Sequence, residues 1–72
     1  MAGKVIKNNI RVLRFQNDEM TQAALADKSG VTRQTILAIE AAKYAPSLEL
    51  AFKISDIFST PLEDVFQYVD KE

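Results

Sequence analysis

The chain has 72 residues, of which ten are acidic and nine are basic, and its formal net charge is −1. A chain of this length closes one hydrophobic core at most, so we expect residues 1–72 to form a single domain that relies on dense packing or on a partner subunit. Because cysteine and histidine are both absent, disulfides, cysteine- or histidine-based metal sites and imidazole chemistry are excluded.

The N-terminus and the apolar runs argue against export and membrane insertion. Residues 1–4 lead into no signal-peptide core. The longest apolar runs are far shorter than the roughly 20 residues that cross a bilayer. We therefore expect a cytoplasmic protein without a membrane partner.

The charges are unevenly distributed along the chain. Residues 4–14 include four basic residues and no acidic one, whereas residues 55–72 include five acidic residues and a single lysine. A chain with this asymmetry can present a basic face to an anionic partner while its acidic end points away. The small net charge still predicts modest non-specific affinity for a nucleic acid.

Apolar residues recur at spacings of three and four along most of the chain, which predicts a nearly all-helical fold. A first helix is expected over residues 8–16, with Ile10 and Leu13 facing inward. Thr21 is a good N-cap for a second helix. Gly30 is expected to end that helix, because glycine tolerates the left-handed conformation common at this position.

The third helix is expected after a very short turn. Thr32 can cap it, and residues 33–41 can form it. Ser47 is expected to cap a fourth helix, whose apolar positions form one stripe: Leu50, Ala51, Ile54, Ile57 and Phe58. This is the clearest core helix of the sequence.

The last part of the chain combines a helix signal with an extended segment. Residues 60–63 contain a capping box with proline at the first helical position, which predicts a short fifth helix reaching about Phe66. Residues 4–7 and 66–69 are apolar and tolerate β structure. They are consistent with a short β-ladder, within one subunit or across a dimer, and equally with frayed ends anchored by apolar side chains.

The informative stretch runs from Thr21 to Glu40, because it combines two helices with a glycine-bearing turn. At about 100° per residue, Ile36 and Ile39 point to one side of the second of these helices. The opposite side carries Arg33, Gln34, Leu37, Ala38 and Ala41.

This outward face begins with two side chains suited to reading DNA bases. Arginine can bind guanine O6 and N7 together, and glutamine can bind adenine N6 and N7, each with about 1–3 kcal/mol of discrimination. Thr35 and Ala38 are small enough for close approach of the helix. Either of them, or Leu37, could touch a thymine methyl group.

Six segments of the chain carry a known family pattern: residues 8–14, 20–26, 30–36, 39–40, 43–44 and 46–51. In these segments the sequence resembles Cro and phage-repressor type helix-turn-helix proteins of the Xre group. Residues 60–66 further resemble the ending of the compact stand-alone bacterial regulators of this group, which dimerise. The resemblance implies an all-α, five-helix lambda-repressor-like fold with the helix-turn-helix at about residues 21–41.

The resemblance also implies roles for individual residues. DNA contacts are expected from the starts of the second and third helices, the exposed face of the third and the loop after it: Thr21, Gln22, Thr32, Arg33, Gln34, Thr35, Leu37, Ala38, Lys43 and Tyr44. In the family, the glutamine at the position of Gln22 holds a backbone phosphate and braces the recognition helix. Arg14 and Glu40 match a structural ion pair that ties the first helix to the third.

The chain departs from the family pattern in two regions. Ala41 and Ala42 stand where the family often has Asn-Gly or Ala-Gly, and a positive φ at Ala42 would cost about 1 kcal/mol. Val12 and Phe15 are more apolar than the exposed side of a first helix requires. They belong either to the edge of the core or to a subunit interface.

These observations lead to a hypothesis of a homodimeric, sequence-specific regulator in the bacterial cytoplasm, associated with the nucleoid, with no enzymatic activity, cofactor or evident small-molecule effector. Two-fold symmetry would place the recognition helices about 34 Å apart, so the operator should be an inverted repeat of double-stranded DNA. Repression is expected, because the chain has no room for an activation domain. The dimer interface is expected near the two ends: Val5, Ile6, Phe66 and Tyr68.

Two rival hypotheses were weighed. The first is an antitoxin-like protein-binding module with autoregulatory DNA binding, whose contact surface would include Val12, Phe15 and Leu37. The second is an enzyme. Carboxylate pairs such as Glu63 and Asp64 occur, but no nucleophile with a base and no Gly-rich phosphate loop accompanies them.

Overall fold

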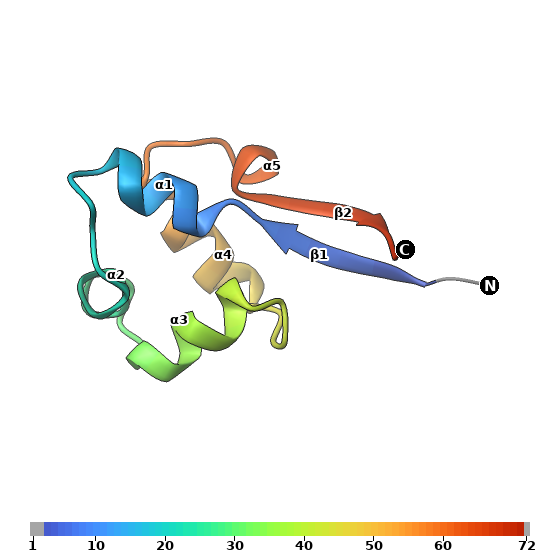
Figure 1. The fold of residues 1–72 in the computed structure, drawn as a ribbon, viewed down its shortest axis with the longest axis horizontal. Coiled ribbons are helices and arrows are strands. Elements are labelled where there is room, and N and C mark those ends of the chain that lie inside the picture. Colours follow the sequence, from blue (N-terminus) through green and yellow to red (C-terminus); the bar gives the residue numbers. More distant parts are fainter. Residues whose placement is uncertain (1–2, 72) are drawn as a thin grey trace.

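The computed structural model describes residues 3–71, so Met1, Ala2 and the acidic Glu72 lie outside the described residues. The described part of the chain forms five helices and two strands (Figure 1). In chain order these elements are β1 (Lys4–Asn8), α1 (Ile10–Gln16), α2 (Gln22–Ser29), α3 (Arg33–Glu40), α4 (Leu48–Ile57), α5 (Leu62–Val65) and β2 (Phe66–Asp70). The predicted five-helix fold with a short terminal β-ladder is confirmed.

α1 begins two residues later than predicted. Asn8 belongs to β1, and the helix starts at Ile10, whose N–H donates to the Asn8 side-chain Oδ1 at 3.2 Å. The strand therefore runs directly into the helix, and the asparagine side chain satisfies an N–H of the first turn.

The helix-turn-helix segment has the predicted caps. The Thr21 Oγ1 accepts from the Ala24 N–H at 3.0 Å, and the Thr32 Oγ1 accepts from the Thr35 N–H at 3.3 Å. Gly30 has a φ of 76°, the left-handed conformation expected after α2. The Val31 N–H then donates to the Ala26 carbonyl at 3.0 Å, which closes the end of α2 before α3 begins.

The hydrophobic core draws on every helix. It consists of Ile10, Leu25, Ala26, Ile36, Ile39, Leu50, Ile54, Phe58 and Val65, with Leu13, Met20, Val31, Ile57 and Phe66 packed against it. α3 packs on α2, and α2 also contacts α4. Burial of each large apolar side chain contributes about 1.5–3 kcal/mol, so the core fixes α3 firmly to the helices behind it.

α5 is shorter than predicted and lacks the predicted capping box. The helix begins at Leu62, with Pro61 in the cap position and no side-chain cap hydrogen bond. The Thr60 Oγ1 instead donates to the Phe58 carbonyl at 2.9 Å. The helix ends at Val65, because Phe66 enters β2 with a φ of −126° and a ψ of 140°.

The two ends of the chain pair with each other within one subunit. β1 and β2 form an antiparallel ladder in which Val5 faces Val69 and Ile6 faces Tyr68. Figure 1 shows this ladder projecting from the helices, with both ends of the chain at its tip. Among the arrangements consistent with the sequence, the intrasubunit ladder is therefore the one formed.

The ladder also corrects the expected separation of charges. Antiparallel pairing brings the basic N-terminal segment beside the acidic C-terminal one, and the Lys4 Nζ lies 3.5 Å from the Asp70 Oδ1. Only α5, which carries Glu63 and Asp64, lies on the side of the molecule opposite α3 (Figure 1). The polarity of the chain is therefore smaller in three dimensions than along the sequence.

Candidate nucleic-acid interface

α3 has one buried face and one exposed face. Ile36 and Ile39 are 0% and 2% exposed, whereas Arg33 and Gln34 in the first turn are exposed. Farther along the same face Leu37 is exposed, and the small residues Thr35 and Ala38 are half-buried. The polar side chains at the start of α3 therefore stand on a helix that is locked from behind.

The starts of α2 and α3 add further polar groups. Thr21 and Thr32, the two N-cap residues, are exposed, and Gln22 in the first turn of α2 is half-buried. The Thr32 and Thr35 hydroxyl oxygens lie 3.1 Å apart. Free N–H groups at helix N-termini attract anions, and these ends can approach phosphates.

Arg14 and Glu40 form the expected ion pair between α1 and α3. The Arg14 Nε lies 2.7 Å from the Glu40 Oε2, and the Arg14 Nη2 lies 3.0 Å from the Glu40 Oε1. The two side chains are only 14% and 10% exposed. The Arg14 Nη1 also donates to the Met20 carbonyl at 2.8 Å, so one guanidinium joins α1, the segment before α2 and the end of α3. A guanidinium held in this way is not available as a phosphate contact.

Gln22 reaches the same ion pair. Its Nε2 lies 3.5 Å from the Glu40 Oε1, which connects the first turn of α2 to the last residue of α3. The pattern of the motif placed Gln22 at the helix start, but it carried no signal for this contact. The contact holds the glutamine beside α3.

The loop after α3 is held by a left-handed residue. Ala42 has a φ of 60°, so the condition for strain at this position is met. The Lys43 N–H donates to the Ala38 carbonyl at 2.9 Å, and the Lys43 and Tyr44 side chains are exposed. The loop therefore presents one cation and one aromatic hydroxyl beside the exposed face of α3.

Ala42→Gly is expected to stabilise the protein by about 0.5–1 kcal/mol, because it relieves the left-handed strain at the cost of some unfolded-state entropy. Urea unfolding measures the change. Ala41→Gly is the matched control, since Ala41 has an ordinary φ of −79° and the same exchange there should destabilise. Equal effects at the two positions would contradict the assigned strain.

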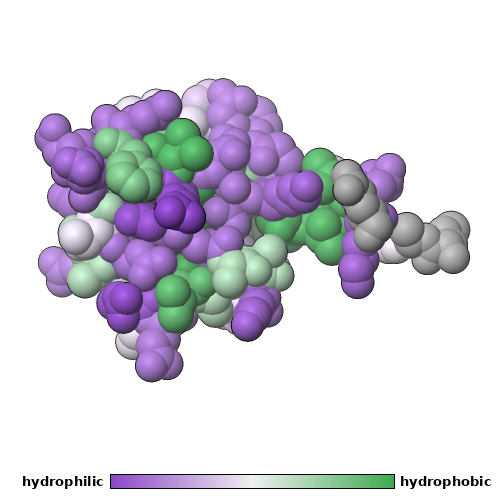
Figure 2. Space-filling view, in the orientation of Figure 1, coloured by the Kyte–Doolittle hydropathy of each residue, from purple (hydrophilic) through white to green (hydrophobic). Residues whose placement is uncertain are grey.

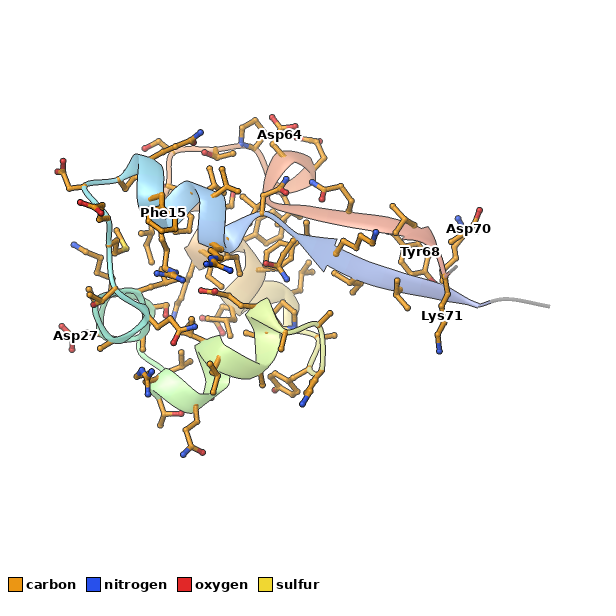
Figure 3. All side chains as sticks on the ribbon, viewed as in Figure 1. Phe15, Asp27, Asp64, Tyr68, Asp70 and Lys71 are labelled. Atoms are coloured by element: carbon orange, nitrogen blue, oxygen red, sulfur yellow. The ribbon has the colours of Figure 1, made fainter. Side chains whose placement is uncertain are left out.

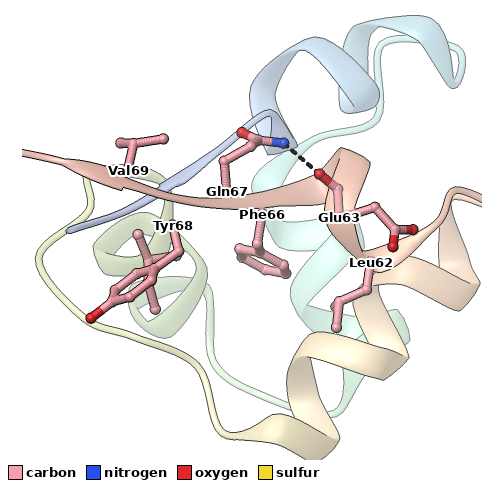
Figure 4. A pocket seen from close by; sticks show the side chains of 7 residues that line it. Leu62, Glu63, Phe66, Gln67, Tyr68 and Val69 are labelled. Atoms are coloured by element: carbon pink, nitrogen blue, oxygen red, sulfur yellow. Dashed lines mark hydrogen bonds between the residues drawn. The ribbon is translucent and has the colours of Figure 1, made fainter. Parts of the chain in front are cut away.

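A second surface lies where the ladder meets α5. An apolar groove there is lined by Ile6, Leu62, Phe66 and Tyr68, among others. Figure 4 shows Phe66 and Tyr68 on the same side of β2 as Leu62, with Gln67 and Val69 on the other side. Leu48 of α4 continues this apolar surface through a neighbouring hollow that also contains Ile6, Leu62 and Phe66.

Three of the four residues expected at a subunit interface therefore lie together. Ile6, Phe66 and Tyr68 share one face of the ladder, and Tyr68 is 68% exposed. Val5 pairs with Val69 and lies on the opposite face, because successive strand residues alternate sides. It is half-buried and does not line the groove below α5.

Apolar side chains on α1 form a separate exposed surface. Val12 and Phe15 are 54% and 56% exposed, which excludes their placement at the edge of the core. Figure 3 shows Phe15 on the helical part of the molecule, away from Tyr68 on the ladder. Figure 2 likewise shows apolar atoms in separate patches among hydrophilic ones.

Other kinds of site find no support in residues 3–71. No group of three or more acidic side chains gathers there in a way that could hold a metal ion. Over the same range, no helix has the length and apolar character needed to span a membrane.

The interface coincides with a known family region. Residues 16–65 match the family described as Helix-turn-helix. The chain belongs to the Xre-type helix-turn-helix family. The match contains α2, α3 and the loop after α3, so the predicted resemblance is confirmed, and membership makes the chain a DNA-binding helix-turn-helix protein.

Similar helix-turn-helix proteins occur in archaea and bacteria. An HTH-type transcriptional regulator of Methanocaldococcus jannaschii is 51% identical over 67 residues, which cover 93% of this chain and 100% of the relative. One of Bacillus subtilis is 48% identical over 61 residues, covering 85% and 91%. One of Archaeoglobus fulgidus is 51% identical over 53 residues, covering 74% and 76%.

Proposed function

We propose that this helix-turn-helix protein is a sequence-specific transcriptional repressor that binds an inverted-repeat operator as a homodimer. The observation that carries the proposal is the exposure of Arg33 and Gln34 at the start of α3, opposite the buried Ile36 and Ile39. A helix held in this way can enter the major groove without losing its orientation. The names of the similar proteins, which are transcriptional regulators, support the same role.

The proposed contacts divide into base reading and phosphate binding. Arg33 would bind guanine and Gln34 adenine, while Thr35, Leu37 or Ala38 would touch a thymine methyl group. Phosphates would be held by the helix starts and the following loop: Thr21, Gln22, Thr32, Lys43 and Tyr44. The phosphate contacts would set the register of the protein, and the base contacts would select the sequence.

A second copy of the chain is the proposed occupant of the groove at the ladder. The exposed Ile6, Tyr68 and Leu48 form an apolar surface continuous with the partly buried Phe66. A two-stranded ladder is marginally stable by itself in water, so packing against a partner would stabilise it. Two-fold symmetry across this surface would present two α3 helices to successive major grooves, about 34 Å apart.

The proposed outcome is repression by excluding RNA polymerase from the operator, in the cytoplasm at the nucleoid. The proposal assigns no catalytic step, cofactor or small-molecule effector to the chain. Its basis is the DNA-facing helix, because the other apolar surfaces are suited to protein contacts rather than to chemistry.

Selection of bound duplexes from a random pool tests the proposal directly. The expected product is an inverted repeat with half-sites one helical turn apart, about 10–10.5 base pairs centre to centre. Binding measured at several salt concentrations should weaken steeply with salt for both the selected and a random duplex. Recovery of no common sequence would contradict the proposed function.

Arg33→Ala is expected to weaken binding to the selected operator by about 1–3 kcal/mol and to relax preference at one base pair per half-site. Fluorescence anisotropy with the selected duplex and with single-base variants measures both effects. Arg11→Ala on α1 is the matched control, since it removes an exposed arginine outside the helix-turn-helix. An equal loss on operator and random DNA would reassign Arg33 to phosphate binding.

The exposure of Val12 and Phe15 favours a second candidate function. In an antitoxin-like protein these side chains on α1 would hold a partner protein, and DNA binding would serve autoregulation. Co-expression with the product of the adjacent gene tests this alternative. A stable complex that Phe15→Ser abolishes would support it, whereas a complex unaffected by the substitution would contradict the assigned surface.

A further inference from the structure

We infer that Asn8 is a positioning residue that sets the orientation of α3 relative to the ladder, and thereby relative to the second subunit. The inference rests on the proposed function, because it takes α3 as the base-reading helix and the ladder as part of the subunit contact. It concerns a residue that no sequence motif marked for this role.

Asn8 ends β1 and contacts two helices through its side chain. The Asn8 Nδ2 donates to the Ile39 carbonyl at 2.9 Å and lies 3.5 Å from the Glu40 carbonyl oxygen. Its Oδ1 accepts from the Ile10 N–H at 3.2 Å. One half-buried amide therefore satisfies carbonyls at the end of α3 and an N–H at the start of α1, groups that have no partner within their own helices.

This amide is the polar connection between the ladder and α3. Among the described residues, Asn8 alone donates side-chain hydrogen bonds from the ladder to that helix. The other polar side chains that hold Glu40 come from α1 and α2, through Arg14 and Gln22. The end of α3 is therefore held on one side by the helices and on the other by the ladder.

The proposed subunit contact begins close to this connection. Ile6 and Asn8 lie on the same face of β1, because side chains two residues apart on a strand point the same way. Ile6 lines the groove, while Asn8 reaches the end of α3. A tilt of the ladder would move Asn8 and α3 together, and a binding helix must be held within about 0.5 Å to keep its contacts.

Asn8→Asp separates the two roles of the amide. The substitution keeps an oxygen that can accept from the Ile10 N–H, but it replaces the donor to the Ile39 carbonyl by a second acceptor. Asn9→Asp is the matched control. It makes the same charge change one residue later, where the amide donates to the Asp64 carbonyl in α5 at 3.0 Å.

We expect Asn8→Asp to bind the selected operator about tenfold more weakly than Asn9→Asp, because two carbonyls at the end of α3 lose their donor. Affinity for a random duplex should fall equally in both variants, since each adds one negative charge. Sedimentation should show the same dimerisation constant for both. Amide hydrogen exchange at residues 39–43 should be faster in Asn8→Asp.

Asn8→Ser and Asn9→Ser repeat the comparison without a charge change. Serine can still cap α1 but is too short to reach the Ile39 carbonyl. Equal operator affinities and equal exchange within both pairs of variants would overturn the inference. If the unaltered protein selects no DNA sequence, the proposed function fails, and the exchange measurement still decides whether Asn8 holds α3.

Discussion

Glu40→Ala is expected to lower the free energy of unfolding by about 3 kcal/mol, because it leaves the largely buried Arg14 guanidinium without its counter-ion. The two lost contacts are those at 2.7 and 3.0 Å. A chain of this length has a total stability of about 4–10 kcal/mol, so a loss of this size brings it near unfolding at 37 °C. Urea unfolding at neutral pH measures the change.

Glu49→Ala is the matched control for the loss of a carboxylate. Glu49 pairs with Lys53 at 3.8 Å, but the two side chains are 82% and 54% exposed, so the expected cost is below about 1 kcal/mol. Combining Arg14→Ala with Glu40→Ala should cost less than the sum of the two single changes, because neither charge is then left unpaired. Equal losses for Glu40→Ala and Glu49→Ala would show that the buried pair does not hold α3.

Tyr68→Glu is expected to convert the dimer into monomers and to weaken operator binding by about 100-fold or more, because each half-site must then be bound separately. The symmetry of the proposed interface would bring the two new carboxylates together in an apolar groove, which is unfavourable. Sedimentation equilibrium measures the subunit association, and fluorescence anisotropy measures binding to the selected duplex.

Two further variants make this experiment decisive. Leu48→Glu places the same charge on α4, at the other side of the groove, and should also give monomers without touching the ladder. Phe15→Glu alters a similarly exposed aromatic residue on α1 and should remain dimeric. Dimers that survive both groove substitutions would place the interface elsewhere, and monomers from Phe15→Glu alone would assign it to α1.

Local features of the sequence predicted most of the helices. The caps at Thr21, Thr32 and Ser47 and the left-handed Gly30 depend on hydrogen bonds and dihedral angles within a few residues, and all of them occur in the structure. The predicted cap at Thr60 was wrong, because its hydroxyl bonds to the Phe58 carbonyl instead. Local patterns therefore succeed where no competing partner lies nearby.

The chemistry of α3 was likewise readable from the residues themselves. At the helical period, Ile36 and Ile39 fall on one side while Arg33 and Gln34 fall on the other, and burial of the isoleucines decides which side faces water. The strain at Ala42 could be stated only as a condition. Its φ of 60° depends on how the loop closes after α3.

Apolar periodicity and capping chemistry, which act over a few residues, determined by themselves that this chain forms a helix-turn-helix with a polar leading edge on α3. Only the tertiary structure decided that the two ends pair within one subunit, that Lys4 lies beside Asp70, and that Asn8 reaches a carbonyl 31 residues away. The physical reason is that these contacts join residues far apart in the chain. Their formation depends on the packing of the whole core and leaves no periodic signal in the sequence.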